Sequence, residues 1–201
     1  VRVYSLLGPG QDPHTYEPVP RDALALARAD LVLLNGYDLD FWAERLLEGA
    51  SPRPPALELA EGVPVEPLPW PGAAKRGDPH LWMDPTLVVH YVEQIAAALA
   101  RLDPEGAPYY RQRAQAYARE LQRLDAWIVA QVSSVPPERR LLVTTHDAYR
   151  YFGRRYGIVI LDTVWGISTE EEPSAYRLAR LFQQLRAYGV PAFVETTINP
   201  Q

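Results

Sequence analysis

A long stretch of helical periodicity, residues 105–135 (EGAPYYRQRAQAYARELQRLDAWIVAQVSSV), constrains the fold of this chain more than any other feature. Its apolar side chains recur at steps of three and four residues, at Tyr110, Ala114, Tyr117, Leu121, Leu124 and Ile128. The spacing predicts an amphipathic helix of about 30 residues, roughly 45 Å long at 1.5 Å per residue. In a chain of 201 residues, we interpret such a helix as a rigid spine that joins two lobes.

Short apolar runs alternate with amphipathic segments on both sides of this helix. Runs such as LVLL (31–34) and LLVTTH (141–146) have the composition of buried strands, and VRVYSLL (1–7) alternates like a strand that leads into a loop. This order of strands and helices is typical of α/β folds, and we predict two lobes, each a parallel sheet flanked by helices. The predicted division is an N-terminal lobe over 1–102, a linking helix over 103–135 and a C-terminal lobe over 136–201.

The composition restricts the chemistry open to the protein. Hydrophobic residues make up 47% of the chain, enough to bury a core, and a net charge of −5 argues against a nucleic-acid-binding face. Cysteine is absent, so a metal would be held by nitrogen and oxygen atoms. We find neither the roughly 20 consecutive apolar residues of a membrane span nor a signal-peptide pattern at the start, and an exported protein would be present here as a mature or trimmed form.

Three of the four histidines lie where ligands are commonly bound. Asp-Pro-His occurs at 12–14 and again at 78–80, and the proline restricts the backbone around His14 and His80. His146 follows an apolar strand, and the carboxyl ends of such strands form the crevices of open α/β sheets. The carboxylates of Asp12 and Asp78 are placed to accept a hydrogen bond from the second ring nitrogen of each histidine.

From the pattern alone, two interpretations of these histidines remain open. They either share one metal ion or act separately as turn and surface residues, because their wide spacing lacks the local signature of a zinc motif. His90, between Val89 and Tyr91, is interpreted as a packed or rim residue of a helix. Glu195, at the end of the last predicted strand, is the one carboxylate we can name as a general base, and with Asp12 and Asp78 it is a candidate hydrogen-bond partner for a ligand.

Five segments resemble, in order and spacing, the metal-binding solute-binding proteins of ABC importers, the zinc and manganese uptake cluster. They are LLGPGQDPHTYEPVPRDALALARADLVLLNGYDLDFW, DPHLWMDP, LLVTTHDAYRYFGRRYG, GISTEEEPS and AFVETTINP. The resemblance spans essentially the whole chain and implies two α/β lobes connected by one long helix, with the metal between them. It also implies a chain truncated at both ends relative to the family.

Carried over by position, the resemblance implies that His14, His80 and His146 bind the metal, with a fourth ligand, an aspartate, beyond Gln201. Three neutral imidazoles suit Zn²⁺ better than Mn²⁺, although manganese stays an alternative. The implied protein is a monomeric, non-catalytic receptor in the periplasm or on the outer face of the membrane, and it delivers metal to an ABC permease. We expect imidazole protonation to compete with the metal below about pH 6 to 6.5.

Two other functions remain compatible with the residues. Three histidines and a water on zinc are also the layout of a hydrolase, which the lack of a convincing general base besides Glu195 disfavours. An adhesin or scaffold with an incidental metal is the third class.

Overall fold

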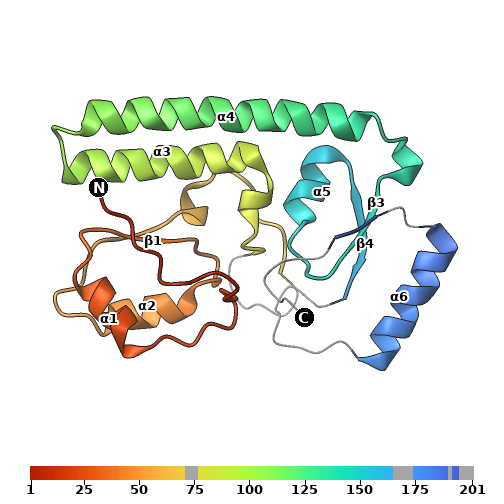
Figure 1. Cartoon of the computed structure of the whole chain (residues 1–201), viewed down its shortest axis with the longest axis horizontal. Helices are drawn as coiled ribbons and strands as arrows, with labels where there is room; N and C mark the ends of the chain where they lie inside the picture. Colours follow the sequence, from red (N-terminus) through yellow and green to blue (C-terminus); the bar gives the residue numbers. More distant parts are fainter. Residues whose placement is uncertain (71–76, 165–173, 190–191, 195–201) are drawn as a thin grey trace.

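The computed structural model describes residues 1–70, 77–164, 174–189 and 192–194, and it is an α/β protein of two lobes. Each lobe contains a small parallel sheet, and a pair of long helices runs along the molecule (Figure 1). The predicted fold class is confirmed. The exact residue boundaries of the lobes stay a prediction.

The first lobe is built around two short parallel strands. Its elements are α1 (Pro20–Ala27), β1 (Val32–Leu34), α2 (Phe41–Glu48), β2 (Ala56–Glu58) and the 3-10 turns η1 (Ala60–Gly62) and η2 (Leu81–Met83). Strand β1 pairs with β2 from Val32 opposite Ala56 to Leu34 opposite Glu58. The core between the helices and β1 contains Leu26, Val32, Leu34, Trp42, Ala43 and Leu47.

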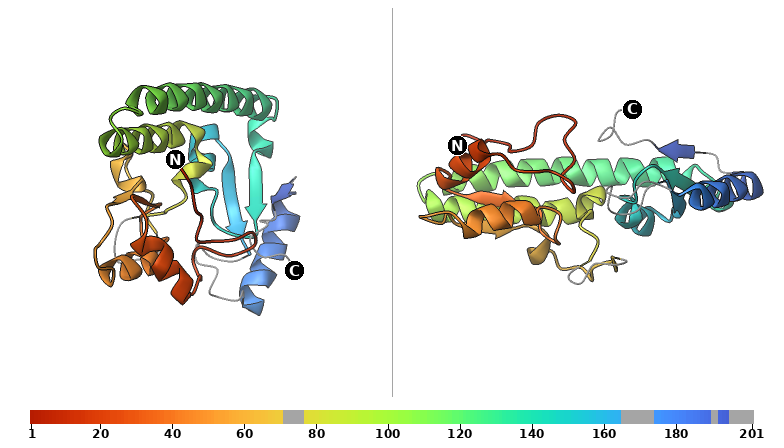
Figure 2. Two further views of the ribbon diagram at one scale, coloured as in Figure 1. Left: turned by 60° about the vertical axis from the view of Figure 1, so that its left-hand side comes forward. Right: turned by 90° about the horizontal axis from the view of Figure 1, so that it is seen from below.

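The predicted long helix is present as α4 (Ala107–Ser133), 27 residues that extend about 40 Å at 1.5 Å per residue. It packs against α3 (Pro85–Leu102), and both views of Figure 2 keep the two helices side by side. Helix α3 begins as its sequence predicts, since the Asp84 side chain accepts from the backbone N–H of Thr86 at 2.9 Å. Helix α4 continues past α3 to the second lobe, where it contacts α5 (Arg150–Tyr156).

The buried face of α4 is narrower than the predicted apolar stripe. Leu121 is buried, whereas Tyr117 and Leu124 are 50% and 44% exposed. The reason is geometric: both lie about 60° around the helix from the Ala114–Leu121 line, because three residues turn an α-helix through about 300°. Tyr117 and Leu124 therefore lie at the edge of the packed face of α4 and not within it.

The second lobe contains a three-stranded parallel sheet in the order β4-β3-β5. Besides α5, its elements are β3 (Leu141–Thr144), β4 (Val159–Thr163), α6 (Ala175–Tyr188) and β5 (Ala192–Val194). Helix α5 ends at Gly157, whose φ of 69° is in the left-handed region, so the chain turns there into β4. The 3-10 turn η3 (Pro137–Arg139) leads from α4 into β3.

The strand predicted over residues 1–7 is not formed. Val1 and Val3 are 84% and 88% exposed, and this segment pairs with neither of the sheets found in the described residues. Alternating apolar residues favour a strand only where a neighbouring strand accepts the backbone hydrogen bonds and a core accepts one face. The prediction for this segment was wrong for that reason.

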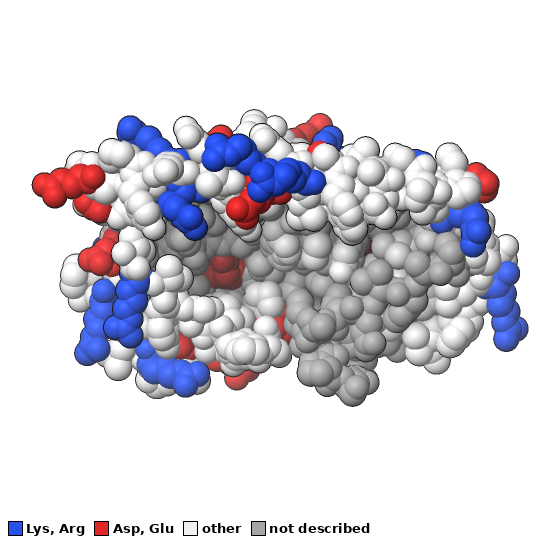
Figure 3. Space-filling view, turned by 45° about the horizontal axis from the view of Figure 1, so that its top comes forward, with Lys and Arg blue, Asp and Glu red and all other residues white. Residues whose placement is uncertain are grey.

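The described residues contain no helix that combines the length and the apolar character needed to cross a membrane. On the face drawn in Figure 3, Lys and Arg side chains are interspersed with Asp and Glu side chains. Mixed charge of this kind is typical of a solvated surface.

Candidate metal centre

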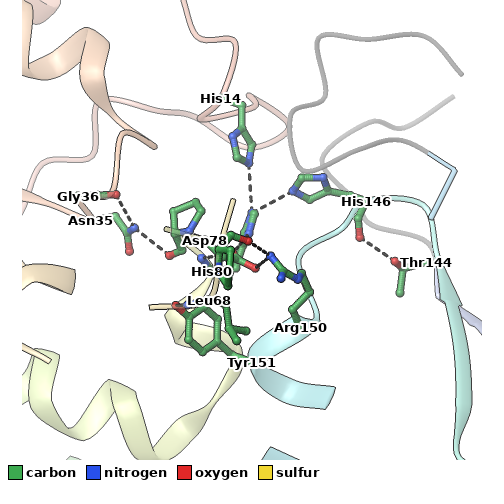
Figure 4. A network of polar contacts seen from close by, with 12 residues as sticks. His14, Asn35, Gly36, Leu68, Asp78, His80, Thr144, His146, Arg150 and Tyr151 are labelled. Atoms are coloured by element: carbon green, nitrogen blue, oxygen red, sulfur yellow. Dashed lines mark hydrogen bonds and ion pairs between the residues drawn. The ribbon is translucent and has the colours of Figure 1, made fainter. Parts of the chain in front are cut away.

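The structure brings together the imidazoles of His14, His80 and His146, although each is separated from the next by 66 residues of sequence. Nε2 of His80 lies 3.2 Å from Nε2 of His14 and 3.0 Å from Nε2 of His146 (Figure 4). Two nitrogens bound to one tetrahedral zinc at 2.0–2.1 Å are about 3.3 Å apart. The three rings therefore already have nearly the spacing that a shared ion requires.

His14 is held by the loop that precedes it. Its backbone N–H donates to Oδ1 of Asp12 at 2.9 Å, and the carbonyl of Pro13 accepts from the indole of Trp42 at 3.0 Å. Trp42 belongs to α2 and lies in the core of the first lobe. The first contact fixes the turn of the Asp-Pro-His triplet, and the second attaches the triplet to the core of the first lobe.

His80 is held by two polar contacts that leave Nε2 directed at the other two rings. Asp78, fully buried, accepts through Oδ1 from the backbone N–H of His80 at 3.0 Å and lies 2.7 Å from its Nδ1. With Nδ1 donating to this carboxylate, neutral His80 has its lone pair on Nε2. The carbonyl of Pro79 accepts from Asn35 at 3.0 Å, and Asn35 in turn accepts from Tyr91 of α3 at 3.0 Å.

His146 comes from the other lobe, two residues beyond the carboxyl end of β3. Its backbone carbonyl accepts from the Thr144 hydroxyl at 2.8 Å and from the N–H of Ala148 at 2.9 Å. Both His146 and Thr144 are buried. The strand end therefore fixes the backbone of the histidine that meets the two loop histidines.

Burial and like charge act together on the electrostatics of this cluster. Removal from water, followed by the proximity of His80 and His146, lowers the pKa of His14 to about 3. His14 is therefore neutral at neutral pH, which is the form that binds a metal. For this residue, protonation competes at a far lower pH than the value of about 6 to 6.5 expected from an ordinary histidine.

The remaining residues singled out in the sequence have other positions. The contact described for Asp12 is to the backbone of His14 and not to its ring. His90 lies on α3 with its Nδ1 3.8 Å from Glu93, a partly exposed helix pair. Glu195 lies outside the described residues, so its proposed part in the site stays a prediction.

Three residues near the site were missed in the sequence. Trp70 and Trp82 place their rings 6.3 Å and 5.1 Å from that of His80, and Arg150 contacts Asp78. The only available signal was proximity in sequence, since Arg150 is four residues after His146 and Trp82 is two after His80. Their role depends on contacts between distant segments, which periodicity does not encode.

Fold and site together define a two-lobed α/β protein with three buried imidazoles that meet where the lobes face each other. A comparison with models of known protein families identifies the family of this chain. The chain belongs to the family described as ZnuA, zinc-uptake complex component A, periplasmic, whose model matches residues 1–201.

Individual relatives agree on the family and differ in the metal that they are named for. The chain is 39% identical over 193 residues to the manganese-binding lipoprotein MntA of Halalkalibacterium halodurans (94% of this chain, 62% of that protein). It is 34% identical over 200 residues to the iron-binding protein YfeA of Yersinia pestis (98% and 63%). The chain therefore spans less than two thirds of the length of these relatives.

The structural comparison supports the same family. The periplasmic zinc-binding protein TroA of Treponema pallidum superimposes with a TM-score of 0.89 at 34% identity, over 97% of this chain and 70% of that one. A likeness this close extends to both lobes and to the helices between them.

Proposed function

We propose that this protein captures a divalent transition metal, preferably Zn²⁺, with His14, His80 and His146, and delivers it to the membrane permease of an ABC importer. The observation that carries the proposal is the convergence of three Nε2 atoms, all candidate ligand atoms lying within 4.8 Å of one another. Ligands contributed by both lobes suit a carrier, because separation of the lobes opens the site.

The preference for zinc rests on the donor set. Three neutral imidazoles suit zinc or copper, whereas manganese prefers more oxygen ligands. The names of the relatives include manganese and iron, and TroA is named for zinc, so the metal must be decided on this protein. Calorimetric titration of Zn²⁺ into the Mn²⁺-loaded protein is the direct test, and we expect zinc to displace manganese.

A carrier is favoured over a hydrolase by the state of Asp78, a buried carboxylate that contacts the proposed ligand His80. Asp78 uses Oδ1 for His80 and has Oδ2 3.4 Å from the guanidinium of Arg150. A general base must be free to take a proton from a metal-bound water. Asp78 is committed to positioning, which supports binding and release without turnover.

The family supports a proposal for the cellular setting. We propose that the protein works as a monomer in the periplasm or at the outer face of the membrane, with the metal and the permease as partners and no nucleic acid. Size-exclusion chromatography with light scattering, with and without zinc, tests the monomer. Cell fractionation tests the compartment.

Calorimetric zinc titration of point variants tests the assignment of the site. We expect one ion per chain, and we expect His14→Gln and His146→Gln each to weaken binding by more than about a hundredfold, beyond the usual effect of outer-shell changes. His90→Gln is the matched control, because His90 lies on the partly exposed face of α3. Equal losses in all three variants would refute the assignment.

A further inference from the structure

Arg150, the first residue of α5, contacts two parts of the first lobe that border the histidine cluster. Its Nη1 donates to the carbonyl of Pro69 at 2.5 Å and lies 3.4 Å from Oδ2 of Asp78. The other oxygen of Asp78 holds the His80 ring, so one guanidinium from the second lobe reaches the partner of a proposed ligand (Figure 4). The Arg150 side chain is 26% exposed and that of Asp78 is fully buried.

Helix α5 contacts the same stretch of the first lobe at two further points. The Tyr151 hydroxyl accepts from the backbone N–H of Leu68 at 3.1 Å, and Arg154 donates to the carbonyl of Glu66 at 3.2 Å. Tyr151 is fully buried, and the Arg154 guanidinium lies 4.8 Å from the centre of its ring. One helix of the second lobe therefore binds the backbone of residues 66–69 repeatedly.

This stretch continues into Trp70, whose indole borders the site. The ring centroid of Trp70 is 5.8 Å from that of His14 and 6.3 Å from that of His80, with the latter pair stacked at 23°. A shift of residues 66–69 would move the indole away from both imidazoles. Contacts made by the second lobe thus fix an aromatic wall of the site in the first.

We propose that Arg150 is a positioning residue that couples the second lobe to Asp78 and to Trp70, and thereby slows the release of metal. The part of this inference that concerns metal release rests on the proposed function, because it requires zinc to bind at this site. Release requires His146 to part from His14 and His80, and Arg150 shares the lobe of His146.

The chemistry of the contact explains why its loss has consequences at the site. A guanidinium hydrogen bond to a carboxylate is charge-assisted and stronger than a neutral one. Arg150→Met leaves Oδ2 of Asp78 buried without this partner, which is unfavourable, and also removes the bond that holds the exposed Pro69 carbonyl. The structure relaxes by loosening Asp78, and with it the orientation of His80.

Stopped-flow release of zinc to an excess of chelator measures the effect. We expect Arg150→Met to release zinc about tenfold faster, within the range found for outer-shell changes at metal sites. Arg150→Lys should be intermediate, because one ammonium is a point charge without the planar fork of a guanidinium. Bound Co²⁺ should keep the same number and type of ligands in all variants by its absorption spectrum, because Arg150 orients a ligand and is not one itself.

Arg155→Met is the matched control on the same helix. Arg155 pairs with Asp125 of α4 at 2.7 Å, so this variant removes the same charge and an ion pair but leaves the Arg150 contacts. We expect it to release zinc at the wild-type rate. An equal acceleration in both variants would overturn the proposal, because it would show a general effect of loosening α5.

Hydrogen exchange in the metal-free protein gives a second readout that needs no metal. The amides of Leu68 and Asp78 are both bonded across this region, to the Tyr151 hydroxyl and to the Leu68 carbonyl. Faster exchange over residues 66–70 in Arg150→Met but not in Arg155→Met supports the contact, even if no metal binds and the proposed function fails. Unchanged exchange, or faster exchange with an unchanged release rate, overturns the proposal.

Discussion

Removal of the His14 imidazole should reduce the acid sensitivity of the metal-free protein. The pKa of His14 is lowered to about 3 by burial and then by His80 and His146, whereas an unfolded chain has a histidine pKa of about 6.5. The folded state therefore resists a proton that the unfolded state accepts. Stability from this residue is fully present above about pH 6.5 and is lost progressively as the pH falls toward about 3.

The size of the effect follows from these two pKa values. Between about pH 7 and pH 5, only the unfolded state takes up the proton, and linkage gives a loss of about 2 kcal/mol in the free energy of unfolding. Urea unfolding in the presence of a chelator, at both pH values, measures this loss in wild type and in His14→Gln. We expect the wild-type loss to exceed that of the variant by about 2 kcal/mol.

The control for this urea-unfolding measurement is a histidine outside the cluster. His90→Gln should retain the wild-type pH dependence, because the His90 side chain is 37% exposed. Identical pH dependence in wild type and His14→Gln would refute the reasoning, since it would mean that His14 takes up its proton equally in both states.

Further predictions concern the hydrogen-bond partner of His80, the core and the coupling of metal to folding. Asp78→Asn should weaken zinc binding about 10- to 100-fold by calorimetry, because the amide replaces a carboxylate that orients His80; wild-type affinity would exclude that role. Leu47→Ala, at a residue 1% exposed, should cost about 2–5 kcal/mol in urea unfolding, whereas Leu124→Ala, at 44% exposure, should cost far less; comparable costs would contradict the core assignment. Zinc at about a hundredfold its Kd should stabilise wild type by about 2.7 kcal/mol and leave His80→Gln nearly unchanged in a thermal melt, and an equal gain in both would place the metal elsewhere.

The parts of the fold that the sequence predicts are those with strong local signals. Three- and four-residue periodicity identifies α4, and Asp84 before Pro85 identifies the start of α3. Residues 1–7 show the limit of such signals, because alternation does not reveal whether a partner strand is present. Burial on α4 was overpredicted for a similar reason, because the neighbouring helix decides which apolar residues are covered and leaves Tyr117 and Leu124 exposed.

The candidate site likewise contains residues that the sequence predicts and residues that it does not. The repeated Asp-Pro-His drew attention to His14 and His80, and the position of His146 after a strand suggested that it could join them. Arg150 and Trp70 could not be found by this route, since the Arg150 contacts span 81 and 72 residues of sequence. Side-chain contacts at that separation depend on how the two lobes face each other.

X-ray absorption at the zinc edge, on protein loaded with one equivalent of Zn²⁺, tests the central claim most directly. The proposed site predicts three imidazole nitrogens at about 2.0–2.1 Å, with the multiple-scattering pattern of histidine rings. His90→Gln should leave this spectrum unchanged, and His80→Gln should remove one imidazole from it. A shell without imidazole scattering, or one that keeps three imidazoles in His80→Gln, would contradict a zinc ion held by His14, His80 and His146.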